Sequence, residues 1–81
     1  MRFYFLRGRG QRAAQTIRPV MTSDLSRAKW QIIYYLAKRD SAPEEQIVNS
    51  IGFDYGTTMA ALRSLKAGRF IGEEGREEME E

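Results

Sequence analysis

The sequence predicts a single, mainly α-helical domain with a short β-segment near its C-terminal end. Three observations predict this fold class: apolar residues recur at helical spacing in three stretches, capping residues stand between them, and Phe70 and Ile71 follow Gly68 as an apolar pair. A chain of 81 residues has room for one small hydrophobic core. The hydrophobic fraction of 42% and the charged fraction of 30% are typical of a globular protein.

The residue types present exclude several classes of protein. The sequence contains no Cys and no His, which excludes zinc fingers, disulfide-rich miniproteins and catalytic centres built on Cys or His. It has no phosphate-loop motif, and its glutamates cluster near the C-terminus without a pattern that would shape a pocket. We therefore expect a protein that is not an enzyme, with no cofactor, no metal ion and no small-molecule substrate.

The hydropathy pattern predicts a soluble, cytoplasmic protein without a membrane partner. No stretch approaches the roughly 20 consecutive apolar residues that a membrane-spanning helix needs. The N-terminal MRFYFL segment is too short for the apolar part of a signal peptide, and it runs directly into RGRGQR without a small-residue cleavage site.

The charged residues divide the chain into three parts. Residues 1–18 contain five arginines and no acid, residues 19–72 contain seven basic and five acidic residues, and residues 73–81 contain six glutamates and one arginine. Runs of like charge at chain ends often mark interaction tails, and the alternative is an ordinary solvated end. We predict a basic N-terminal arm over 1–20, a folded helical domain over 21–75 and an acidic segment over 76–81.

The basic arm is predicted to be extended or partly strand. It opens with an aromatic run and continues with arginines separated by Gly8 and Gly10. Glycine at two positions in three disfavours a stable helix, because glycine loses the most backbone freedom on folding. A short helix could follow over 13–17, where Pro19 would prevent its continuation.

A first helix is predicted over about 25–39, because Ser23 or Asp24 is a good N-cap and apolar residues follow at helical spacing. The apolar residues form two stripes, the first being Leu25, Ala28, Ile32, Tyr35 and Leu36 and the second Trp30, Ile33, Tyr34 and Ala37. A surface helix needs one stripe, so the second must pack on the aromatic arm or on the same helix of a second chain. We predict a homodimer, with an interface formed by Trp30, Ile33, Tyr34, Phe3 and Phe5.

A second helix is predicted over about 43–51. Ser41 and Glu44 have the spacing of a capping box, and Pro43 suits the first turn of the helix. Gly52 follows the last apolar residue, which is typical of a left-handed C-cap.

A third helix is predicted over about 55–67. Asp54 is its N-cap, apolar residues recur at helical spacing, and Gly68 closes it. A short strand at 70–71 is then expected, with a possible return strand from Glu77 onward.

Two short helices joined by a tight glycine-containing turn, after a first helix, form the core of a helix-turn-helix. The stretch QIVNSIGFDYGTTMAALRSLKAGRFI resembles the winged helix-turn-helix family, and the resemblance covers about 25–72. The matching positions are the helix end Ile51 and Gly52, apolar Phe53, the small and polar Asp54 to Thr58, the leucines Leu62 and Leu65, and the exit Gly68 to Ile71. The resemblance implies a mainly α fold with a small β-wing: a three-helix winged helix-turn-helix core preceded by the basic arm.

The sequence departs from the family pattern in two places. Arg69 stands where a glycine before the wing strand is usual. The segment that would form the wing, IGEEGREEMEE, is short and acidic, and its glutamates would repel DNA phosphates. Residues 76–81 are accordingly either the end of a wing or an acidic tail.

The resemblance implies that the third helix enters the major groove of DNA with its N-terminal residues at base edges. The DNA-binding residues expected on this helix and at its exit are Tyr55, Thr57, Arg63, Lys66 and Arg69. Arg63 is the best candidate for a base contact, because a guanidinium group pairs with guanine O6 and N7. Three residues of the arm, Arg7, Arg9 and Arg12, are expected to bind phosphate or to enter the minor groove. The alternative for each is an ordinary solvated surface residue.

These observations predict a sequence-specific, double-stranded DNA-binding protein, of the type of small transcriptional regulators in prokaryotic or archaeal genomes and their viruses or plasmids. The alternative is a winged-helix interaction module of a larger assembly, in which protein contacts dominate. A third, weaker reading is RNA or single-strand binding by the Arg/Gly arm.

Overall fold

The computed structural model describes residues 2–16 and 23–75. In this part of the chain there are four helices, α1 (Gly8–Ala14), α2 (Asp24–Ala37), α3 (Glu44–Ser50) and α4 (Tyr55–Ala67). The strands are β1 (Arg2–Leu6), β2 (Ala42–Pro43) and β3 (Ile71–Gly75). The fold is therefore mainly helical with a small sheet, an arrangement compatible with that of a winged helix. None of the described helices is long and apolar enough to cross a lipid bilayer.

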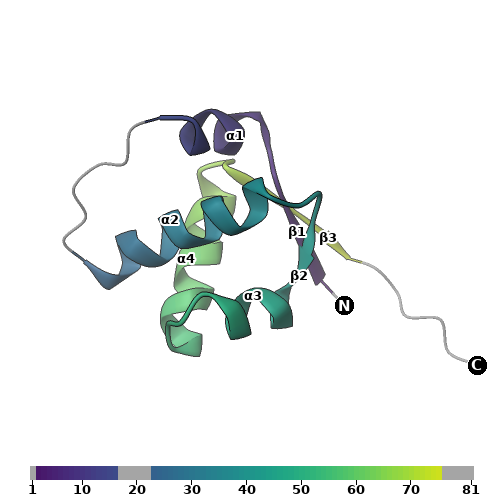
Figure 1. The fold of residues 1–81 in the computed structure, drawn as a ribbon. Helices are drawn as coiled ribbons and strands as arrows, with labels where there is room; N and C mark the ends of the chain where they lie inside the picture. Colours follow the sequence, from purple (N-terminus) through teal and green to yellow (C-terminus); the bar gives the residue numbers. More distant parts are fainter. Residues whose placement is uncertain (1, 17–22, 76–81) are drawn as a thin grey trace, which may run out of the picture.

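The helices pack against one another and against one face of the sheet. Helices α2 and α4 cross beside the sheet, α1 lies at one end of the molecule and α3 at the other (Figure 1). Helix α4 begins beside α3 and ends beside α1, so its two ends have different surroundings. The large side chains at the centre of the core are Ile32, Leu36, Ile47, Leu62 and Ile71.

The sheet is antiparallel, and its strand order is β2-β1-β3. Strand β1 is therefore the central strand, with Tyr4 opposite Ala42 on one side and Glu73 on the other. Alternate residues of a strand point to opposite faces. Accordingly Tyr4 is buried in the core, whereas Phe3 and Phe5 are half-buried.

Two of the predicted helices begin at the capping residues that the sequence indicated. The Ser23 hydroxyl oxygen accepts a hydrogen bond from the Ser26 backbone N–H at 3.1 Å, which caps α2. Asp54 caps α4 in the same manner, and Gly52 has the positive φ of 78° expected after the end of α3. The prediction of a helix over 55–67 is confirmed at both ends.

The prediction that glycines keep the arm from forming a helix is wrong. Residues Gly8–Ala14 form α1, and the backbone N–H of Arg7 at its start donates to the Phe70 carbonyl oxygen at 2.9 Å. Gly10 is buried against this same carbonyl, and a Cβ atom built there would lie 2.2 Å from the Phe70 oxygen. The close approach needs a glycine, so tertiary packing outweighs its low helix propensity.

The capping box predicted for the second helix is also wrong. Helix α3 starts one residue later than the first predicted position, with Pro43 at the N-cap and no side-chain hydrogen bond there. Residues Ala42–Pro43 are instead strand β2, paired with β1. The Glu44 carboxylate accepts a hydrogen bond from the Tyr4 hydroxyl at 3.0 Å, so it serves the contact between α3 and the sheet.

The second apolar stripe of α2 is partly covered within the chain. Helix α2 packs against α4, α1 and β1, and Ile33 is only 3% exposed. Ile33 is therefore a core residue, and its prediction as part of a dimer interface is wrong. Trp30 and Tyr34 stay half-buried, with ring centroids 5.6 Å apart. Contacts of α2 with α1, β1 and α4 thus cover part of this stripe within the chain, and the homodimer itself stays a prediction.

Strand β3 pairs with β1, which was part of the predicted arm. The predicted partner strand, from Glu77 onward, and the acidic segment 76–81 lie outside the described residues. Phe5 stands opposite Gly72 in this pairing, and a Cβ atom on Gly72 would lie 2.4 Å from the Phe5 ring. Phe5 therefore packs on its own sheet, although it was predicted at a dimer interface.

Helix α4 ends in a left-handed turn formed by an arginine. Gly68 has an ordinary helical φ of −82°, and Arg69 after it has a φ of 65°. The backbone N–H groups of Arg69 and Phe70 donate to the carbonyls of Lys66 and Leu65, at 3.0 Å and 2.9 Å. This is the hydrogen-bond pattern of a Schellman motif, and it directs the Arg69 side chain away from the core.

Candidate nucleic-acid interface

The exposed face of α4 is cationic and partly lined by small residues. The helix contains no Asp or Glu within its 13 residues. Arg63 is exposed near the middle of the helix, and within the described part of the chain its side chain makes no hydrogen bond or ion pair. Ala60, about one turn earlier, is half-exposed, and Gly56, about two turns earlier, is exposed, so small residues line the face of α4 on the N-terminal side of Arg63.

The N-terminal end of α4 is occupied by its own cap. The Asp54 carboxylate accepts hydrogen bonds from the Thr57 hydroxyl at 2.7 Å and from the Thr57 backbone N–H at 3.0 Å. These hydrogen bonds lower the pKa of Asp54, because they stabilise the ionised carboxylate. The Thr57 hydroxyl is therefore engaged within the helix cap, whereas Tyr55 beside it is 62% exposed.

Lys66, near the C-terminal end of α4, is engaged in an ion-pair network. Its ammonium group is hydrogen-bonded to Glu73 on β3, and the Arg2 side chain reaches the same carboxylate at 3.0 Å. The Lys66 hydrogen bond, with the charges of Lys66 and Arg2, lowers the pKa of Glu73. Glu73 thus partly neutralises the cation that was predicted to hold the DNA backbone.

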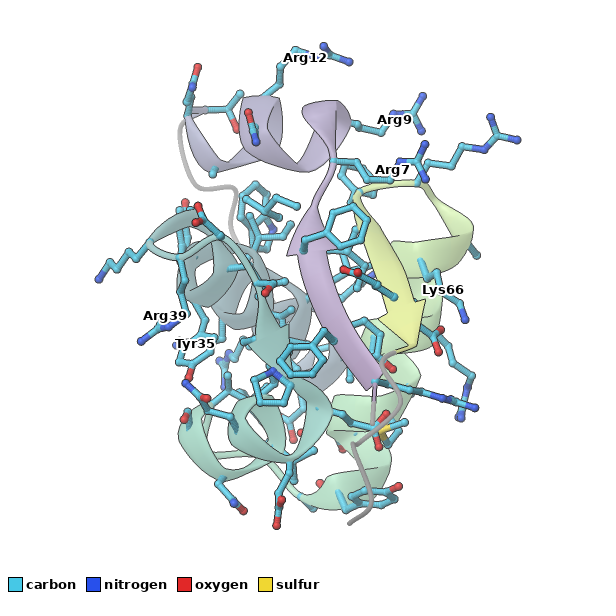
Figure 2. All side chains as sticks on the ribbon, turned by 90° about the vertical axis from the view of Figure 1, so that its right-hand side faces the viewer. Arg7, Arg9, Arg12, Tyr35, Arg39 and Lys66 are labelled. Carbon is cyan, nitrogen blue, oxygen red and sulfur yellow. The ribbon has the colours of Figure 1, made fainter. Side chains whose placement is uncertain are left out.

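The arm arginines gather at the end of the molecule formed by α1. Figure 2 shows Arg7, Arg9 and Arg12 at this end, with Lys66 further along the β3 side. The Arg9 guanidinium donates to the Gly68 carbonyl oxygen at 2.9 Å and lies 5.5 Å from the Phe70 ring centroid. A cation bound to the last carbonyls of a helix is favoured by the helix dipole. Arg9 therefore links α1 to the end of α4.

We call this surface the arginine end, and define it as Arg7, Arg9, Arg12 and Arg69. All four side chains are exposed. Within residues 2–16 and 23–75, Arg9 has the contacts above, and the side chains of the other three make no hydrogen bond or ion pair. The sequence placed Arg69 on the helix exit and the other three on a separate arm, and the fold brings them together.

A further polar cluster, which the sequence did not indicate, lies on the side away from Lys66 (Figure 2). The Arg39 guanidinium lies 3.7 Å from the Tyr35 ring centroid and donates to the Tyr35 carbonyl oxygen at 2.7 Å. Ser50 and Gln46 of α3 donate to the Tyr35 hydroxyl oxygen, and these hydrogen bonds lower the pKa of Tyr35. The cluster joins α2 to α3, and only the folded chain brings its members together.

No family model, curated protein or solved structure matched the chain. Within the described residues, no group of three or more His, Cys, Asp or Glu side chains is placed to hold a metal ion.

Proposed function

We propose that the protein binds double-stranded DNA in a sequence-specific manner and acts as a transcriptional regulator, with α4 in the major groove. The observation that carries this proposal is the exposed face of α4, where Arg63 makes no hydrogen bond or ion pair within residues 2–16 and 23–75, on a helix free of acidic residues. A helix of this kind fits the width of the major groove, and phosphate attracts its positive charge.

The residues of α4 have different parts in this proposal. Arg63 hydrogen-bonds a guanine edge, and the small residues Gly56 and Ala60 let the helix approach the bases closely. Tyr55 reaches a backbone phosphate. The Thr57 hydroxyl is held by Asp54, which leaves its methyl group for contact with a thymine methyl group.

A second candidate function is a protein-interaction module with little DNA contact. The carboxylates of Asp54 and Glu73, near the two ends of α4, favour it because both repel phosphate. A duplex titration at several salt concentrations separates the two functions. The DNA-binding proposal requires a steep salt dependence and a preference for a selected site over random duplex of at least about 10³.

Substitution of Arg63 by Ala is expected to weaken binding to the selected site about 10-fold, with little change for random duplex, because a base contact discriminates between sequences. Fluorescence anisotropy with a site selected from a random library measures both affinities. The control is Arg27→Ala, which removes an exposed arginine of α2 that lies 3.8 Å from Asp24. An equal loss for both duplexes would assign Arg63 to a phosphate contact and contradict its part in reading bases.

Substitution of Glu73 by Gln is expected to tighten binding to every duplex about 3-fold to 10-fold, because it removes a negative charge and releases Lys66 and Arg2 for phosphate. The same titrations measure the change. Glu45→Gln, at an exposed position of α3, is the control for the change of net charge alone. Equal gains for the two variants would show that release of Lys66 has no part in the effect.

A further inference from the structure

We infer that the arginine end is a second DNA contact, which binds the phosphate backbone of the same duplex beside the C-terminal end of α4. This inference rests on the proposed function and adds a division of labour to it. Helix α4 reads bases, Arg7, Arg12 and Arg69 bind phosphate, and Arg9 positions them.

The arginine end carries positive charge. The arginine end is built from two segments that contain no acidic residue, 2–16 and 63–72. Asp40 is the acid that faces α1, across a hollow of about 460 Å³ that Gln11, Gln15 and Arg39 also line. Arg39 also lines this hollow, so its lining contains one acidic and one basic residue. By contrast with Lys66, none of the three phosphate-binding arginines has an acidic partner within the described residues.

Helix α1 is attached to the turn that follows α4. Arg9 is bound to the Gly68 carbonyl, and the Arg7 backbone N–H is bound to the Phe70 carbonyl at 2.9 Å. Gly10 brings the α1 backbone against this same turn. The backbone that carries Arg7 and Arg12 is thus fixed at the end of α4. These arginines therefore lose less conformational freedom on binding than arginines of a flexible arm would lose.

The helical form of α1 and the length of α4 favour a contact with phosphate. Residues Gly8–Ala14 are helical, whereas a minor-groove arm is an extended segment that lies in the groove. Helix α4 has 13 residues and is about 20 Å long, which exceeds the roughly 12 Å width of the major groove. When α4 reads bases, its C-terminal end therefore comes out beside a backbone strand, where the arginine end meets phosphates. The phosphate alternative of the sequence prediction is the one that this geometry favours.

The test compares salt dependence and sequence preference. In the double variant Arg7→Gln/Arg12→Gln, each lost phosphate contact is expected to lower the slope of log K against log salt by about 0.9. We expect a slope shallower by about 2 and an affinity about 10-fold or more lower at 100 mM salt. The ratio of specific to random affinity stays the same, because phosphate contacts carry no sequence information.

Three matched variants complete the experiment. Arg27→Gln/Lys38→Gln on α2 and just after it removes the same charge elsewhere and is expected to keep the wild-type slope. Arg7→Lys/Arg12→Lys is expected to keep it as well, since lysine also binds phosphate. Arg63→Ala reports on α4 alone, and thermal melts confirm that each variant is folded.

Each outcome decides the inference. A shallower slope in the glutamine pair, with wild-type slopes in the control and lysine pairs, supports it. If the glutamine and control pairs change the slope equally while Arg63→Ala lowers specificity, the arginine end is not a contact and the proposed function stands. If the lysine pair loses as much as the glutamine pair, phosphate attraction is not the cause. If wild-type protein binds no duplex, the proposed function fails, and this inference fails with it.

Discussion

Substitution of Gly10 by Ala is expected to destabilise the protein by about 3 kcal/mol, the upper part of the range for added atoms in a packed site. The new Cβ atom would lie 2.2 Å from the Phe70 carbonyl oxygen and 2.8 Å from Leu6. The nearer obstacle is backbone, which cannot rotate away, so α1 must move off the end of α4. Urea unfolding followed by circular dichroism measures the loss.

Gly8 provides the matched control on the same helix. A Cβ atom there has the end of the Arg12 side chain, at 3.9 Å, as its nearest neighbour. Gly8→Ala is therefore expected to stabilise the protein by about 0.5 kcal/mol, because alanine loses less backbone entropy than glycine. Opposite signs for the two substitutions test the packing of α1. Equal effects would mean that α1 does not lie against Phe70.

Raising the pH from about 10 to 12 is expected to remove about 2 kcal/mol of stability through Tyr4 alone. Burial in the core, together with the hydrogen bond to Glu44 and its charge, raises the pKa of Tyr4 from 10.0 to about 12. The unfolded chain loses this proton near pH 10, while the folded protein keeps it until about pH 12. The stabilisation is thus complete below pH 10 and is lost as the pH rises toward the folded value.

Comparison with Tyr4→Phe isolates this effect from the titration of lysines and other tyrosines. Between pH 9 and pH 12, the free energy of unfolding of the wild type should fall by more than that of Tyr4→Phe. Tyr55→Phe, at a side chain that is 62% exposed, is the control for the loss of one phenol hydroxyl group. A pH-independent difference for Tyr4→Phe would contradict the burial of the Tyr4 hydroxyl beside Glu44.

Much of the helical part of the fold was predictable, because its signals are local. The Asp54 cap, the apolar spacing and the glycine after the helix lie within α4 or next to it, and the predicted range 55–67 is the observed one. Ser23 and Gly52 carry the same kind of information for α2 and α3. Caps and periodicity act over a few residues, so they can be recognised without knowledge of the partner surface.

The N-terminal segment was not predictable in this way. The glycine-rich stretch disfavours a helix, yet Gly8–Ala14 is one, because Gly10 fits against a carbonyl about 60 residues further along the chain. Glu44 had the spacing of a capping residue, but Tyr4 takes its carboxylate in the folded protein. Ile33 was expected to pack on the aromatic arm or on a second chain, and it is buried within the folded chain.

The candidate site shows the same division. The exposed cation Arg63 follows from helical periodicity, and the structure leaves it exposed. That Arg9 binds the end of α4 and that Lys66 is paired with Glu73 could not be recognised from the sequence pattern. Each contact joins residues of different helices or strands, so it depends on how these elements pack in the folded chain.

The sequence by itself therefore determined where α2, α3 and α4 lie and which face of α4 is cationic. Only the tertiary structure decided that β1 is the central strand, that the arm arginines join Arg69 at one end and that Glu73 competes for Lys66. The physical reason is the distance along the chain over which each kind of interaction acts. Helix caps and apolar periodicity are settled among neighbours, whereas the charge that a surface presents depends on contacts between residues far apart in the chain.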